Sequence, residues 1–288
     1  MGLAFATDQM VAPTNTAQGQ AAKVQSKQSS ALSQAISQLK EQELAKVIQE
    51  AAAALQETQQ ALLLLQKGKV QEALQLLQKV QVTLEQLIQK YGLVKLPVDV
   101  QFIEFNGIED LELAMKYNKQ VKKLVAENDF VDARFLLALL RDEIDIVTTY
   151  LPLGLYKQAI DLAVKLLQAG QVDAAILAIQ SALGTLEVET VVIPKPILEA
   201  QYLIAQAEKI YKVNPDLAMQ LISRAEYDLR LSVALGYIRS LEDVKPLLEK
   251  LEELKKAIKA HAATVEEQFQ EATKGMQQVR QRATTTTH

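Results

Sequence analysis

The chain has 288 residues, no cysteine, two histidines and a formal net charge of -4. Its length is sufficient for one large or two smaller domains with a hydrophobic core. The absence of cysteine excludes disulfides and thiolate chemistry. Lysine and glutamate are mixed along the same segments, so no basic stripe is available for nucleic acid. The longest apolar runs, 61–65 and 135–140, are much shorter than the roughly 20 residues needed to cross a bilayer.

The N-terminal residues 1–28 are polar and lack helical periodicity, so we expect a disordered or processed segment. Within it, Ala4-Phe5-Ala6 has the small-x-small form of a signal-peptidase site, although no charged or apolar stretch precedes it. One interpretation is a periplasmic protein whose signal peptide has been removed. The alternative is an irregular start to a cytoplasmic protein.

A helix-turn-helix pattern recurs at residues 64–73 and 166–175. In both copies an apolar helix end is followed by a glycine, Gly68 or Gly170, and then by an alanine in the next helix, Ala73 or Ala175. Glycine accepts the left-handed conformation that ends a helix, and alanine suits a close helix crossing. Fainter copies at 128–133 and 213–218 predict a series of stacked helical hairpins.

Apolar residues at a spacing near 3.6 predict most of the remaining elements. The helices are expected at 29–66, 70–90, 108–127, 131–151, 155–169, 172–186, 197–213 and 215–239. Two segments rich in β-branched residues, 97–105 and 188–193, predict short strands that pair with each other. We therefore expect a mainly α-helical domain at 29–239, a repeat-like bundle of antiparallel hairpins with a minor two-stranded β element.

Residues 240–282 keep apolar side chains at alternating spacings of three and four, which predicts one long amphipathic or coiled-coil helix. Its C-terminal seam includes Leu248, Leu251, Ile258, Val265 and Phe269. Such a stripe packs either on its own domain or on another subunit, and we expect it to contribute to a homo-oligomer. Residues 283–288 are expected to form a disordered tail.

The residues that usually carry chemistry are few. The two histidines, His261 and His288, are far from the predicted hairpins, and His261 is expected on the surface. The glycines are isolated helix ends and form no phosphate-binding loop. Carboxylates such as Asp142 and Glu143 alternate with basic residues and are typical of solvated faces. We expect no catalytic residue, no metal site and no cofactor.

The segment 150–154 interrupts the helical pattern, because Pro152 disfavours helical geometry at Leu151. The simplest interpretation is a corner between two helices. A corner bordered by Tyr150, Leu153 and Tyr156 could also wall an apolar pocket with a hydroxyl at its rim.

The order of several motifs resembles the YfdX family of bacterial proteins. Leu96-Pro97-Val98-Asp99 follows a helical hairpin, Leu151-Pro152-Leu153 forms the corner, and the hairpin around Gly170 precedes a valine-rich strand. In the family a Val-Pro-Ile-Asp segment and a Met-Pro-Leu corner occur in the same order. The resemblance covers about residues 30–193; Val98 and Leu151 are conservative departures.

The resemblance implies a non-enzymatic, exported helical protein tied to acid and multidrug stress. It implies binding of small amphipathic molecules or of unfolded protein clients, as in a chaperone. The candidate ligand-binding residues are Asp99, Tyr150, Pro152, Leu153 and Tyr156. Any acid dependence would come from carboxylates such as Asp99, Asp142 or Glu143, below about pH 5. The alternative is an intracellular tetratricopeptide-like adaptor for protein-protein interaction, although irregular turn spacings and strand-like inserts disfavour it.

Overall fold

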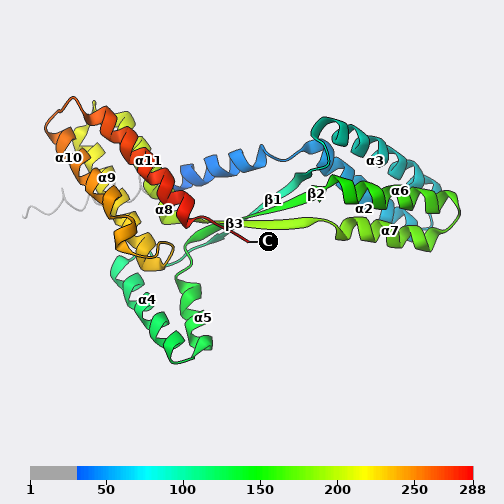
Figure 1. Ribbon diagram of the computed structural model, residues 1–288, viewed down its shortest axis with the longest axis horizontal. Helices are drawn as coiled ribbons and strands as arrows, with labels where there is room; N and C mark the ends of the chain where they lie inside the picture. Colours follow the sequence, from blue (N-terminus) through cyan, green and yellow to red (C-terminus); the bar gives the residue numbers. More distant parts are fainter. Residues whose placement is uncertain (1–30, 288) are drawn as a thin grey trace, which may run out of the picture.

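The computed structural model describes residues 31–287 and shows two groups of helices at opposite ends of an antiparallel sheet (Figure 1). The first bundle consists of α2, α3, α6 and α7, and the C-terminal bundle consists of α8, α9, α10 and α11. A separate hairpin of α4 and α5 projects beside the C-terminal bundle. The helices are 31–44, α2 (Gln49–Gln66), α3 (Val70–Tyr91), α4 (Leu111–Ala126), α5 (Phe130–Leu139), α6 (Leu153–Gln168), α7 (Val172–Gly184), α8 (Lys195–Ile210), α9 (Pro215–Leu235), the short 3-10 helix η1 (Leu241–Asp243), α10 (Lys245–Lys259) and α11 (Val265–Ala283).

The repeat seen in the sequence is a shared turn geometry. In the first two copies Gly68 and Gly170 have φ values of 74° and 75°. The amides that follow reach back to the same helical position: Lys69 N donates to Leu64 O at 2.9 Å, and Gln171 N donates to Leu166 O at 2.9 Å. The α4–α5 turn repeats this bond with Asn128 in the left-handed position. The predicted hairpins are therefore confirmed, and so is the mainly α-helical fold class.

The first bundle encloses a continuous apolar core. Ala73 on α3 and Ala175 on α7 are both fully buried in it, as expected for residues at helix crossings. Leu77, Leu84 and Ile160 are fully buried in the same core, so burial of the apolar helix faces holds this bundle together.

The sheet has the order β1-β2-β3-β4, which corrects the predicted two-stranded element. Its strands are β1 (Lys95–Phe105), β2 (Glu143–Pro152), β3 (Glu187–Pro194) and β4 (Thr285–Thr287). The predicted strands correspond to β1 and β3, but β2 lies between them, so they do not pair with each other. The predicted helix at 131–151 is wrong beyond Leu139. Residues 143–152 alternate between buried and more exposed positions over much of their length and are rich in β-branched side chains, which favours a strand.

The single long helix predicted for 240–282 is also wrong. The chain turns at His261, whose φ is 51°, and α11 folds back on α10. All five residues of the C-terminal seam are buried in the core of the C-terminal bundle. Their burial within one chain removes the seam as a reason to expect an oligomer. The predicted tail is wrong as well, because Thr285–Thr287 pair with β3 as β4.

The helix predicted from 29 to 66 is interrupted at 45–48, where the amide of Ile48 donates to the carbonyl of Pro97 in β1 at 2.9 Å. The predicted segment 1–28, with Ala4-Phe5-Ala6, lies outside the described residues, as does His288. Within residues 31–287, no helix combines the length and the apolar character that a membrane span requires.

Candidate ligand-binding pocket

The five candidate residues from the sequence do not converge on one site. Leu153 and Tyr156 are fully buried in the first bundle, and Pro152 is buried at the point where β2 runs directly into α6. Burial raises the pKa of the Tyr156 phenol to about 12. Asp99 pairs with Thr149, the neighbour of Tyr150. Since successive strand residues point to opposite faces, Asp99 and Tyr150 lie on opposite sides of the sheet.

Of the five candidates, only Tyr150 borders a hollow. This hollow has a volume of about 270 Å³ and lies on the sheet face that carries Pro97 and Ile146. The predicted pocket at a helix-to-helix corner is therefore wrong. The reason is that β2 runs directly into α6: a corner between two helices would leave apolar side chains partly open, whereas a strand that continues into a core helix covers them.

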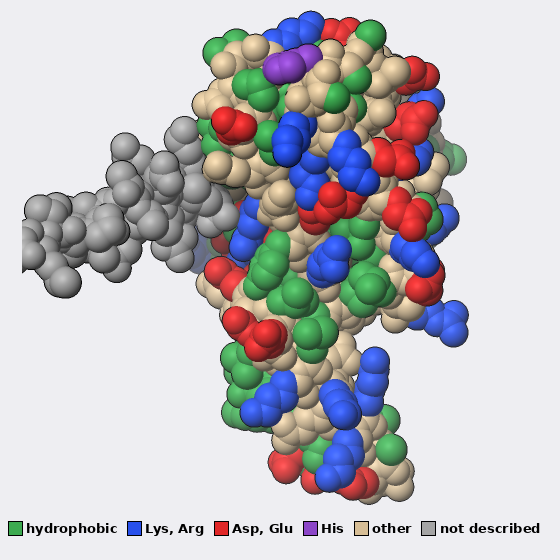
Figure 2. Space-filling model, turned by 90° about the vertical axis from the view of Figure 1, so that its left-hand side faces the viewer, with side chains coloured by type: hydrophobic (Ala, Val, Ile, Leu, Met, Phe, Trp, Pro, Cys, Tyr) green, Lys and Arg blue, Asp and Glu red, His purple; other side chains and the backbone are tan. Residues whose placement is uncertain are grey.

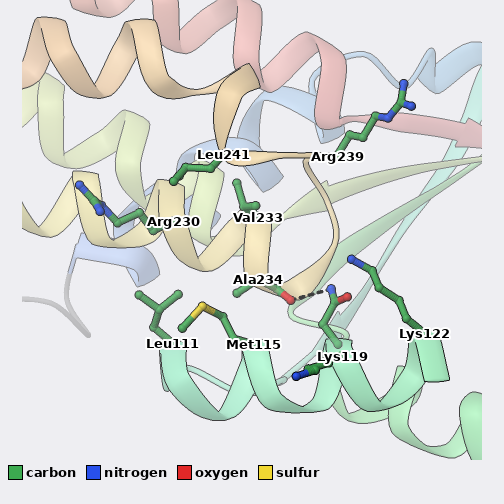
Figure 3. Close-up of a pocket in the computed structure, with 10 residues that line it drawn as sticks. Leu111, Met115, Lys119, Lys122, Arg230, Val233, Ala234, Arg239 and Leu241 are labelled. Atoms are coloured by element: carbon green, nitrogen blue, oxygen red, sulfur yellow. Dashed lines mark hydrogen bonds between the residues drawn. The ribbon is translucent and has the colours of Figure 1, made fainter. Parts of the chain in front are cut away.

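A larger hollow of about 460 Å³ lies between α4, α9 and the segment that leads to η1, and we call it the α4–α9 pocket (Figure 3). Its apolar wall consists of Leu111 and Met115 on α4, Val233 and Ala234 on α9, and Leu241. Leu111 and Met115 point from α4 towards α9. On the face drawn in Figure 2, hydrophobic side chains gather where the projecting hairpin meets the C-terminal helices.

Hydrogen bonds fix the position of α4 against α9. The side-chain amide of Asn118 donates to the carbonyl of Ala234 at 2.8 Å. The phenol oxygen of Tyr227 accepts from the amide of Leu111 at 3.0 Å and donates to the carbonyl of Glu109 at 2.8 Å. Gly236 ends α9 with a φ of 94°, a conformation that other residues rarely adopt. The two walls of the pocket are thus tied at both ends and preformed.

Four basic side chains line the same pocket: Lys119, Lys122, Arg230 and Arg239. None of them forms an ion pair with a carboxylate among residues 31–287. Arg230 lies close enough to Glu226 to contribute to lowering the pKa of that carboxyl, although burial raises it on balance. The pocket therefore combines an apolar wall with an excess of positive charge.

Sequence reasoning missed this pocket because its walls are far apart in the chain. The lysines of α4 read as an ordinary solvated helix face. The only local signal is that Leu111 and Met115 share a helix face with Lys119 and Lys122. Nothing in the periodicity shows that α9 lies opposite them.

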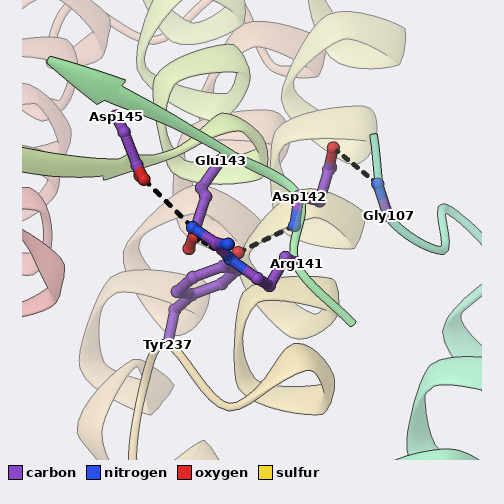
Figure 4. Close-up of polar contacts among 6 residues, drawn as sticks. All are labelled: Gly107, Arg141, Asp142, Glu143, Asp145 and Tyr237. Carbon is purple, nitrogen blue, oxygen red and sulfur yellow. Dashed lines mark hydrogen bonds and ion pairs between the residues drawn. The ribbon is translucent and has the colours of Figure 1, made fainter. Parts of the chain in front are cut away.

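A polar cluster fixes the start of β2 (Figure 4). The guanidinium of Arg141 donates to Glu143 at 2.5 Å and to Asp145 at 3.0 Å, and it lies 3.5 Å from the ring centroid of Phe105. The amide of Asp142 donates to the phenol oxygen of Tyr237 at 2.8 Å. The cluster connects the sheet to the segment after α9.

Gly107 allows the chain after β1 to pass close to this cluster. A Cβ at this position would lie 2.7 Å from the carbonyl oxygen of Arg141, a backbone atom that cannot move aside easily. The amide of Gly107 also donates to the Asp142 carboxylate at 3.4 Å.

Asp142 of this cluster, Glu199 and Asp228 are buried carboxylates whose charges influence one another. Arg224 lies 3.0 Å from Asp228 and 3.8 Å from Glu199, and Lys195 lies 3.7 Å from Asp142. Asp228 is fully enclosed, so burial raises its pKa well above the ordinary value, and the charge of Glu199 raises it further. Burial is also the main cause that raises the pKa of Glu199 and of Asp142. Among the described residues, no group of three or more His, Cys, Asp or Glu side chains is arranged to hold a metal ion.

We expect Asp228→Asn to raise the melting temperature at pH 7. The pKa of Asp228 in the folded chain lies above the unfolded value of about 3.9, so the folded state binds more protons. The free energy of unfolding therefore falls as the pH rises from about 4 through the folded-state pKa, and the full penalty is present only above it. Asparagine keeps the shape without the charge. Each kcal/mol gained shifts the melting temperature by about 2–4 °C in a chain of this size.

Thermal melts between pH 4 and 7 test this expectation, with the exposed Asp173→Asn as a control for loss of one surface charge. The melting temperatures of Asp228→Asn and of the unaltered protein should converge near pH 4. A lower melting temperature for Asp228→Asn at pH 7 would instead mean that its ion pair with Arg224 outweighs the cost of burial.

The fold is that of a mainly α-helical protein whose hairpins flank an antiparallel sheet, with a basic and apolar pocket at one end. Residues 54–192 match the sequence profile of the family described as YfdX protein, and this part of the chain belongs to the YfdX family. A solved structure of Salmonella Typhi YfdX is 15% identical, with a TM-score of 0.37 over 50% of this chain and 90% of that one. No curated protein matches the chain. The matched segment contains α4, whereas α9 lies outside it.

Proposed function

We propose that this chain is a non-enzymatic binding protein of YfdX type that takes small amphipathic molecules into the α4–α9 pocket. The observation that carries the proposal is the preformed hollow with an apolar wall and polar groups at its ends. Met115 and Leu241 in this wall are 52% and 47% exposed, so a ligand would cover apolar surface that now faces water.

Capture of unfolded clients is a second candidate function, and α5 favours it. Only Ala133 of this helix is buried. Phe130, Val131 and Phe135 are 56%, 80% and 69% exposed, although such side chains normally seek a core. An exposed apolar helix on a projecting hairpin suits weak, broad contact with unfolded chains.

Two matched variants on the same hairpin separate the two functions. Met115→Asp places a charge in the pocket wall, and Phe135→Ser removes an exposed ring from α5. We expect Met115→Asp to weaken binding of the neutral dye Nile red about tenfold, because the dye must desolvate the new carboxylate. We expect Phe135→Ser to leave dye binding unchanged and to reduce suppression of aggregation of a heat-denatured client. Fluorescence titration and light scattering measure the two effects.

The control is Leu177→Asp on α7. Leu177 is exposed, and the variant adds the same charge far from the pocket. Dye binding that is lost equally in Leu177→Asp and Met115→Asp would contradict a site at α4 and α9. If Phe135→Ser suppresses aggregation of the client as well as the unaltered protein does, the second candidate function is contradicted.

We also propose that the protein acts in the periplasm, in acid and multidrug stress. The support is the family resemblance together with the cleavage-like Ala4-Phe5-Ala6 sequence. Fractionation of the native host tests the location, and recovery of the protein with the cytoplasmic fraction would contradict it. The tetratricopeptide alternative is not favoured, because a sheet separates the helical hairpins.

A further inference from the structure

The α4–α9 pocket carries a charge asymmetry that neither its apolar wall nor the family explains. All charged residues that line it are basic. A pocket for neutral or cationic amphiphiles would not need four cations, and their mutual repulsion works against the folded state. We infer that the ligand is a free, monomeric anionic amphiphile, with an alkyl chain and a carboxylate or sulfate headgroup; this inference rests on the proposed function.

The positions of the cations indicate where the headgroup binds. In Figure 3, Arg230 lies at one end of the pocket, whereas Lys122 and Arg239 lie towards the other. Glu226 lies one helical turn from Arg230 on α9, but its ion pair at 2.7 Å is with Lys255. Among the described residues, no acidic residue lines the end that carries Lys122 and Arg239, so an anion there gains both attraction and charge-assisted hydrogen bonds.

The apolar wall fits the remainder of such a ligand. Leu111 and Met115 continue from the lysine end along α4, one helical turn apart. Ala234 lies opposite them on α9, and Val233 and Leu241 line the pocket further from α4. An alkyl chain laid along this wall keeps its headgroup at Lys122 and Arg239. The ends of the pocket are held by fixed backbone and side-chain bonds, so its shape favours a single bound molecule over a broad bilayer surface.

The test is isothermal titration calorimetry with three probes of equal chain length, each below its critical micelle concentration. The probes are dodecanoate, the neutral dodecyl maltoside and the cationic dodecyltrimethylammonium. We expect dodecanoate to bind about tenfold more tightly than the other two, because two exposed ion pairs strengthen binding by about two- to thirtyfold. The double variant Lys122→Gln/Arg239→Gln should remove that advantage, so that dodecanoate and dodecyl maltoside bind with similar affinity.

The matched control is Lys116→Gln/Lys123→Gln, which removes the same charge from exposed positions of α4 that do not line the pocket. It should retain the preference for dodecanoate. Equal binding of all three probes would overturn the anionic ligand while leaving the proposed function intact, and failure of all three to bind would overturn the function itself. A preference lost equally in both double variants would overturn the headgroup position. If the protein binds vesicles of anionic lipid more strongly than dodecanoate, and dodecanoate does not compete, the partner is a membrane surface and the free amphiphile is overturned.

Discussion

Phe269→Ala is expected to lower the free energy of unfolding by about 3–5 kcal/mol, the usual cost of removing a fully buried phenylalanine. The ring is completely enclosed in the C-terminal bundle and packs at 5.3 Å from the ring of Tyr211. The surrounding helices cannot collapse onto the gap without shifting Tyr211. Chemical denaturation followed by circular dichroism measures the loss.

Val213→Ala in the same bundle is the control, because Val213 is 89% exposed and its truncation should change stability by less than about 0.5 kcal/mol. Light scattering of Phe269→Ala should show the mass of the unaltered protein. A change in mass without a loss of stability would mean that Phe269 contacts a second subunit instead of its own core.

Ala175→Leu is expected to destabilise the first bundle by about 1–3 kcal/mol, because the added carbons have no space at the crossing of α7 with its neighbours. Ala73→Leu should act in the same way on α3. Both alanines are fully buried and occupy equivalent places in the repeated hairpin. Thermal and denaturant unfolding measure the effect.

The matched control is Ala53→Leu on the exposed side of α2. Leucine is a good helix former, so this exchange should be nearly neutral. Unaltered stability in Ala73→Leu and Ala175→Leu alike would show that these alanines do not mark close helix contacts.

The helical hairpins could be predicted because their turns are local. A glycine after an apolar helix end, as at Gly68 and Gly170, reports a backbone conformation that depends on few distant residues. The turns at Asn128 and His261 use the same left-handed conformation without glycine. Because no glycine marks the turn at His261, the sequence did not indicate the break between α10 and α11. The alternating three- and four-residue apolar spacing also continues through that turn.

The strand β2 and the pocket could not be predicted for a different reason. Residues 143–152 have the alternation of a strand, but the apolar run before them extended the helical pattern without a glycine or proline to interrupt it. β2 is stabilised by pairing with β1 and β3 on both sides, which is a long-range effect. The α4–α9 pocket likewise depends on two helices that meet only in the folded chain.

The position of the α4–α5 hairpin has a consequence for how the chain closes its sheet. β1 and β2 pair along almost their whole length, and the two helices occupy the connection between them. The entropy of loop closure grows only with the logarithm of length, about 0.6 kcal/mol for each doubling. A helical excursion at this point thus costs little in the stability of the strand pairing. The pocket wall of α4 is therefore topologically an insertion into a β-hairpin, and a change in the length of α4 and α5 need not alter the register of the sheet.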